Sequence, residues 1–230
     1  MTGQAAGPAP QDHGGRRDQP FPSDIFTEAE GSNDTLAHLG PLAALAGTWS
    51  GRAGTDAHPV ADGTEMEAYV ETFDLQPIDR QTNGPQLLYG LRYHQHIVKP
   101  GEVETFHDQV GYLLWEPATG AVMMTLAIPR GQAAMAGGHA EPDDRAFTLR
   151  ASAGDPHFGI STNPFLDHAF RTVSWEITFR IGADDTWSYD QTTGLEVLDR
   201  PGVFAHHDSS TMTRIGPPLP NPLAQAPATT

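Results

Sequence analysis

The sequence predicts an all-β fold, a single antiparallel up-and-down β-barrel of about ten strands that follows a short N-terminal helix. From Thr48 onward, short segments alternate in part between apolar and polar residues and are rich in aromatic and β-branched side chains. Turn signals such as Asn83-Gly84 and Pro100-Gly101 separate them at hairpin spacing. No helix of crossover length interrupts the segments, so a parallel sheet is disfavoured. A sandwich remains an alternative, but hairpins in sequential order favour a closed barrel, which can hold a ligand.

The predicted elements follow one another along the chain with short turns between them. Residues 32–49, "SNDTLAHLGPLAALAGTW", begin with three candidate capping residues and predict a short helix that Gly40-Pro41 would split in two. A first strand is expected around 47–54. The further predicted strands are 64–76, 86–98, 102–117, 121–131, 146–152, 171–181, 186–198 and 209–215.

The two ends of the chain differ in composition from the predicted barrel. Residues 1–31 are rich in Gly, Pro, Gln and charge, and we expect a disordered or extended segment there. Residues 217–230 predict a Pro-rich tail, so the barrel domain is expected to span 32–216.

Composition and charge narrow the classes of function. Thirteen Lys and Arg residues against 29 Asp and Glu give a formal charge of −16, which disfavours nucleic acid and anionic membrane surfaces as partners. The absence of cysteine excludes disulfides, thiolate nucleophiles and Cys-ligated metal sites. The first twenty residues contain no signal-like apolar run and no later segment resembles a membrane span, so we expect a cytoplasmic location. Phosphate-loop, Gly-x-Ser-x-Gly and HExxH motifs are also missing, which leaves ordinary hydrolase and nucleotide chemistry without support.

The densest histidine cluster lies in "YHQHIVKPGEVETFHDQ". His94 and His96 would share one face of a strand, with His107 across the following turn. A cupin-like metal site built from these three residues is one hypothesis. The spacing of acid and histidine fits a cupin poorly, so surface or rim positions are favoured for His94 and His96.

The segment "LAGTWSGRAG", residues 45–54, opens the predicted barrel. A Gly-x-Trp motif that leads from a short helix into the first strand is typical of lipocalin-like and fatty-acid-binding-like barrels, in which the Trp, here Trp49, plugs the closed end. With the later segments "FHDQVGYLLW", "IPRGQAAMAGGHA", "RTVSWEITFRI" and "HHDSSTMTRI", the chain resembles the nitrobindin family of haem-binding β-barrels over about residues 39–215. The chain is longer than a minimal member of that family, with extra residues around 74–86 and 159–170.

This resemblance implies that a histidine on the last strand is the single protein ligand of ferric haem b iron. Matching the apolar-x-Arg end of that strand to Met212 and Arg214 places the ligand at His207, whereas a shift of one residue selects His206. The small residues that share a face with His207 favour it as the inward residue and metal ligand; they are Ser209, Thr211 and Thr213.

The resemblance also implies a function. With one axial ligand, haem iron keeps a free position for nitric oxide or for peroxynitrite, which the family isomerises to nitrate, so the chain is a candidate peroxynitrite isomerase. Arg130 is the expected partner of the haem propionates, and Trp49 is placed among the cofactor-binding candidates. The alternative is a non-catalytic carrier of a small apolar ligand, in which the histidine doublet has no ligand role. A homodimer is left open.

Overall fold

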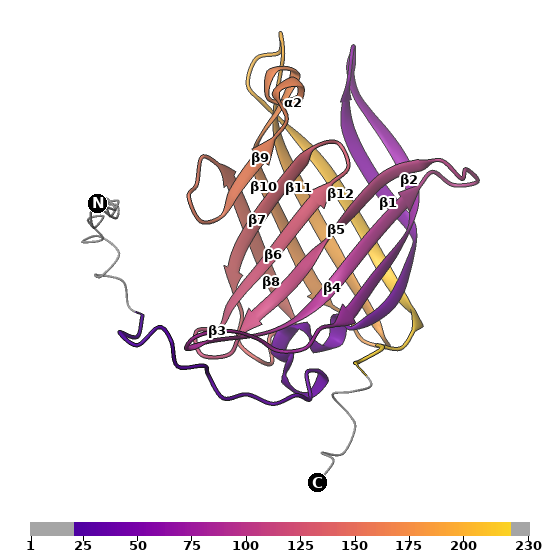
Figure 1. Ribbon diagram of the computed structural model, residues 1–230. Helices are drawn as coiled ribbons and strands as arrows, with labels where there is room; N and C mark the ends of the chain where they lie inside the picture. Colours follow the sequence, from indigo (N-terminus) through magenta and orange to yellow (C-terminus); the bar gives the residue numbers. More distant parts are fainter. Residues whose placement is uncertain (1–20, 222–230) are drawn as a thin grey trace, which may run out of the picture.

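A computed structural model describes residues 21–221 of the chain. Within that range the chain forms twelve strands and three short helices (Figure 1). The helices are η1 (Leu36–His38), η2 (Gly40–Leu45) and α2 (Pro164–Ala169). The strands are β1 (Gly47–Val60), β2 (Gly63–Pro77), β3 (Gln81–Asn83), β4 (Gln86–Val98), β5 (Thr105–Glu116), β6 (Ala121–Ile128), β7 (Gln132–His139), β8 (Ala146–Ala153), β9 (Gly159–Thr162), β10 (Phe170–Ile181), β11 (Thr186–Val197) and β12 (Val203–Gly216).

The strands close into a barrel. Their order is β2-β1-β12-β11-β10-β8-β9-β7-β6-β5-β4, and a further pairing of β2 with β4 completes the ring. β3 adds to the edge of β4, and the four-residue β9 runs parallel to β8 while every other pairing in the described range is antiparallel. Nine of the ten long strands coincide with predicted strands, and the antiparallel barrel of about ten strands is confirmed as the fold class. Closure leaves the long strands without a free edge.

The first and last strands, β1 and β12, pair with each other. Their register is irregular between Gly51 and Thr55, and the same stretch of β1 is irregular against β2. At Gly54 a Cβ atom would lie 2.1 Å from the ring of Tyr69, so only glycine allows that ring to lie over the strand. β1 then continues to Val60, six residues beyond the predicted strand.

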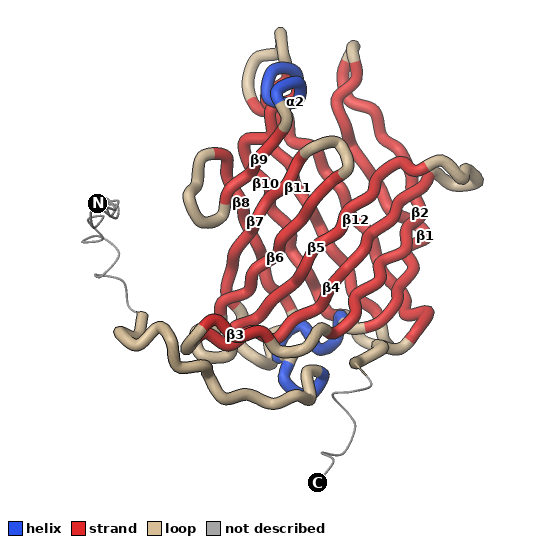
Figure 2. Tube along the Cα trace, in the orientation of Figure 1, coloured by secondary structure: helices blue, strands red, loops and turns tan. Residues whose placement is uncertain are grey.

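One end of the barrel is closed by η1 and η2, which lie at the bottom of Figure 1 and are blue in Figure 2. The predicted split of the helix is present at Gly40, whose φ of +52° suits glycine and whose Cα faces the Trp115 ring. Trp49 is 1% exposed and donates a hydrogen bond from Nε1 to the Leu45 carbonyl at 2.8 Å. The Arg214 guanidinium covers its indole at 4.1 Å, so Trp49 plugs this end as expected.

Strand β7 and helix α2 are absent from the sequence-based expectations. β7 reads "QAAMAGGH" and has almost none of the β-branched or aromatic residues that predict a strand. Its small residues allow close approach: a Cβ at Gly138 would lie 2.2 Å from the Thr148 carbonyl oxygen, and one at Gly137 would meet the Phe158 ring at 2.3 Å. Helix α2 falls in one of the two regions of extra length.

The described parts of the two ends run along the barrel without forming a helix or strand. Ala29 N–H donates to the Gly84 carbonyl at 2.9 Å, and Leu219 N–H donates to Gln76 Oε1 at 2.7 Å. The remainder of the expected terminal segments, residues 1–20 and 222–230, lies outside the described residues. Among the described residues, no helix has both the length and the apolar character needed to cross a bilayer.

Removing the N-cap of α2 is expected to loosen this helix. The Asn163 carboxamide oxygen accepts hydrogen bonds from Phe165 N–H at 2.8 Å and Leu166 N–H at 3.0 Å. Asn163→Ala should cost about 1 kcal/mol of local stability and speed amide hydrogen exchange across 165–169. Ser161→Ala, an exposed change two residues away, is the control. Equal exchange in both variants would contradict the capping role.

Candidate ligand cavity

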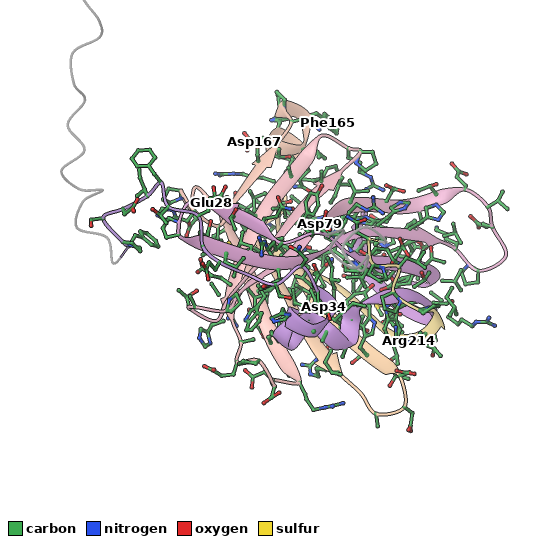
Figure 3. The ribbon with its side chains drawn as sticks, turned by 60° about the horizontal axis from the view of Figure 1, so that its bottom comes forward. Glu28, Asp34, Asp79, Phe165, Asp167 and Arg214 are labelled. Carbon is green, nitrogen blue, oxygen red and sulfur yellow. The ribbon has the colours of Figure 1, made fainter. Side chains whose placement is uncertain are left out.

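A cavity of about 420 Å³ occupies the barrel interior toward the end opposite η1 and η2. Helix α2 lies at this end of the barrel (Figure 1). Its residues Phe165 and Leu166 belong to the cavity lining. Figure 3, turned toward the closed end, shows Phe165 far from Arg214 and Asp34, which lie near the helical turns. The cavity therefore opens at the α2 end, while Trp49 and the core close the other.

The cavity wall combines apolar and polar side chains. Its apolar lining residues are Pro59, Ile97, Phe106, Leu126, Ile128, Ala134, Ile160, Phe165, Leu166, Phe170, Trp175 and Leu195. Its polar lining residues are Asp56, His58, Tyr69, Gln95, His107, Gln109, Arg130, Gln132, Thr172, Tyr189, Gln191, Thr193, His206 and Asp208. Such a lining suits a mainly apolar ligand that also carries polar groups.

The histidine doublet on β12 is split between the two faces of the barrel wall. His206 lines the cavity, in the same inward row as the buried Ser210 and Met212. His207 is exposed on the outer face, where its Nδ1 lies 2.9 Å from Thr192 Oγ1. The preference for His207 as the inward residue is therefore wrong. The small residues beside His207 also face outward. Met212 is 0% exposed and so faces inward, and every second residue before it, including His206, faces inward as well.

His206 belongs to a cluster of acidic and histidine side chains on the cavity wall. Its Nε2 lies 2.5 Å from Asp56 Oδ1 and 3.5 Å from Asp208 Oδ1, while the other Asp56 oxygen, Oδ2, lies 2.5 Å from His58 Nδ1. Gln191 Nε2 donates to Asp208 Oδ2 at 3.0 Å. The Asp56 side chain is 3% exposed and is held away from bulk water, whereas the His206 and His58 side chains are partly exposed.

The electrostatics of this cluster follow from burial and pairing. Burial alone lowers the pKa of His206, but the carboxylates of Asp208 and Asp56 outweigh it and raise that pKa to about 10. Burial raises the pKa of Asp56, yet hydrogen bonds from His206 and His58 hold it at about 2. Burial raises the pKa of Asp208. Without a ligand, His206 is therefore an imidazolium clamped by an ionised Asp56.

Beneath this cluster lies a buried acid that the sequence analysis did not identify. Glu71 is 3% exposed and accepts hydrogen bonds from Gln95 Nε2 at 2.8 Å and from Tyr189 OH at 3.2 Å. The Tyr189 hydroxyl in turn lies 2.7 Å from the Tyr69 hydroxyl. Burial raises the pKa of Glu71, so its carboxyl is held toward the neutral form.

The three histidines of the cupin-like hypothesis are not brought together. His94 Nε2 contacts Asp108 at 2.9 Å and His96 Nε2 contacts Thr105 at 3.1 Å, both hydrogen bonds being exposed on the outer face. His107 instead lines the cavity, where burial lowers its pKa and keeps the imidazole neutral. That metal-site hypothesis is wrong, and the favoured surface or rim position holds for His94 and His96.

The other two predicted site residues lie at different depths. Arg130 lines the cavity and donates a hydrogen bond from its Nη2 to the Phe106 carbonyl at 3.1 Å. Trp49 does not line the cavity, because it belongs to the plug at the closed end. Asp56 and His58 were missed because the first strand was predicted to end near residue 54. The segment "GTDAHPV" has no clear apolar–polar alternation, and burial along β1 alternates only as far as Asp56, so the sequence offers little signal for these two residues.

Comparisons with known proteins agree with the fold. A family model described as "THAP4-like, heme-binding beta-barrel domain" matches residues 38–214. Among solved structures, the chain is similar to Rv2717c from M. tuberculosis, with a TM-score of 0.52 and 20% sequence identity over 80% of this chain and 99% of that one. No curated protein matches the sequence.

Proposed function

Because the chain belongs to the THAP4-like, haem-binding β-barrel domain family, the nitrobindin family, we propose that its cavity binds haem b with His206 as the protein ligand of the iron. The observation that carries this proposal is the inward position of His206 on the last strand of the barrel. Its outward neighbour His207 lies on the other side of the wall and has no access to the cavity.

The donor set fits such a group. Asp56 holds Nε2 of His206, and Nδ1 has no hydrogen-bond partner among the described residues. A carboxylate on one ring nitrogen fixes the orientation of an imidazole and makes the other nitrogen a better donor once the ring has lost a proton. The apolar walls match a porphyrin, and Arg130 offers a cation for a propionate.

The proposed ligands of the protein-bound haem are small. When bound, ferric haem b supplies an open coordination position for nitric oxide and an iron centre able to rearrange peroxynitrite to nitrate. Among the chain's own residues, the neutral His107 offers one donor and one acceptor to a molecule in the cavity. The apolar wall limits the water that reaches such a molecule.

A hemin titration tests the proposal directly. Purified protein should give a saturable shift of the Soret band with one hemin per chain, because the proposed iron ligand, His206, lines one cavity inside the barrel. Nitric oxide added to the loaded protein should shift the band again, and decay of peroxynitrite should accelerate. A spectrum identical to that of free hemin at all protein concentrations would overturn the proposal.

A carrier of a small apolar ligand would use the same cavity. The two proposed functions can be distinguished by which ligand the protein prefers. The ionised Asp56 places negative charge on the wall beside His206, which disfavours the carboxylate head of a fatty acid there. We therefore expect a fluorescent fatty-acid probe to bind weakly and to be displaced by hemin. Tight probe binding without a hemin shift would favour the carrier.

A further inference from the structure

Three carboxylates occupy directly paired positions on neighbouring strands near the open end of the barrel. Asp56 on β1 is paired with Glu67 on β2 and with Asp208 on β12. Directly opposed residues project to the same face, and like charges in such positions destabilise a sheet. The arrangement therefore needs compensating positive charge, part of which His206 and Lys99 supply.

Histidine side chains complete the donor set beside these acids. His58 lies two residues after Asp56 on β1 and so shares its face. Asp56, His58 and Glu67 each offer a ligand atom, and these atoms all lie within 4.8 Å of one another. Glu65 adds a fourth carboxylate, with its Oε2 3.8 Å from His58 Nε2.

An independent observation at Glu67 also indicates a cation. Lys99 pairs with its Oε1, but its Oε2 is shielded from solvent and has no hydrogen-bond partner among the described residues. A buried carboxylate oxygen without a donor is costly, and a bound cation is one partner that would satisfy it. The oxygen belongs to the residue directly opposite Asp56.

We propose that Asp56, His58 and Glu67 form a binding site for one first-row divalent metal ion. Two carboxylates and one imidazole are ligands that Zn²⁺, Mn²⁺, Fe²⁺ and Co²⁺ accept, whereas Mg²⁺ and Ca²⁺ prefer oxygen alone. The site does not depend on haem binding. Asp56 Oδ2 faces His58 while Oδ1 faces His206, so the two functions use opposite oxygens of one carboxylate.

Cobalt(II) titration of untagged, chelator-treated protein tests this site in the absence of hemin. Visible d–d absorption should saturate at one Co²⁺ per chain and be displaced by Zn²⁺. Glu67→Gln, which keeps the side-chain shape, and His58→Ala should each weaken Co²⁺ binding at least about tenfold. His94→Ala is the matched control, because His94 also lies near a carboxylate, Asp108, but on the outer face.

The outcomes separate this inference from the haem proposal. Glu67→Gln should leave the hemin spectrum unchanged, since it touches neither His206 nor the apolar wall. Saturable Co²⁺ binding without a hemin shift would support the metal site and refute haem binding. No saturable Co²⁺ binding, or equal affinity in wild type, Glu67→Gln and His58→Ala, would overturn the metal site whatever hemin does. Circular dichroism of each variant confirms that a loss of binding is not a loss of fold.

Discussion

Replacing His206 with alanine is expected to return the hemin spectrum to that of the unligated cofactor, whereas His207→Ala should keep the wild-type Soret band. The two residues are adjacent and chemically identical, but only His206 lines the cavity. His207 contacts Thr192 on the outer face. The affinity for hemin should fall at least about tenfold in His206→Ala and change little in His207→Ala.

A second variant distinguishes loss of the iron ligand from loss of the fold. His206→Ala leaves Asp56 opposite Asp208 without the imidazole that separates their charges, which destabilises the barrel wall. His206→Gln keeps a hydrogen-bond donor for Asp56 but has no imidazole, so it should fold and still lack the wild-type band. Loss of the band in His207→Ala alone would show that the register assigned to β12 is wrong. Wild-type bands in all three variants would place the iron ligand elsewhere in the cavity.

The register of β12 shows why the sequence could identify the doublet but not its inward member. Both faces of this strand are largely polar, so the usual contrast between a buried apolar row and an exposed polar row is missing. The decisive residue was Met212, the large apolar side chain of the segment 209–213. Counting back from it in steps of two reaches His206. The small residues beside His207 suggested room for a ligand, but they face solvent.

In other parts of the chain, the strength of the strand pattern in the sequence determined which elements could be predicted. The predicted strand 86–98 has the same bounds as β4, because Leu91, Tyr93 and Ile97 are spaced at even intervals in its second half and turn residues flank it. β7 could not be predicted, since its alanines and glycines are selected for close approach to β8 and not for β propensity. The acidic part of the site was missed for a related reason: Asp56 and Glu67 become neighbours only through the β1–β2 register.

Glu71 is the second residue at which a large effect is expected, because it is an acid inside the barrel core. Its carboxyl is the shared acceptor for Gln95 and Tyr189, and the Asp208 charge lies close enough to raise its pKa further. Glu71→Ala would leave these donors without an acceptor and should cost at least about 3 kcal/mol of the free energy of unfolding. Glu71→Gln keeps the shape and one acceptor oxygen, so it should cost less.

Wild type and Glu71→Gln should differ most in how the free energy of unfolding depends on pH. Burial raises the folded-state pKa of Glu71 above its unfolded value, so its contribution to stability is fully present below the ordinary glutamate range and is lost as the pH rises through the folded pKa. Urea unfolding from pH 4 upward should therefore show wild type losing stability relative to Glu71→Gln, which carries no charge to bury. Glu176→Gln, which removes an exposed partner of Arg150, should run parallel to wild type. If wild type and Glu71→Gln keep a constant difference across that range, the pKa of Glu71 is the same in the folded and unfolded chain, which would contradict the effect of burial.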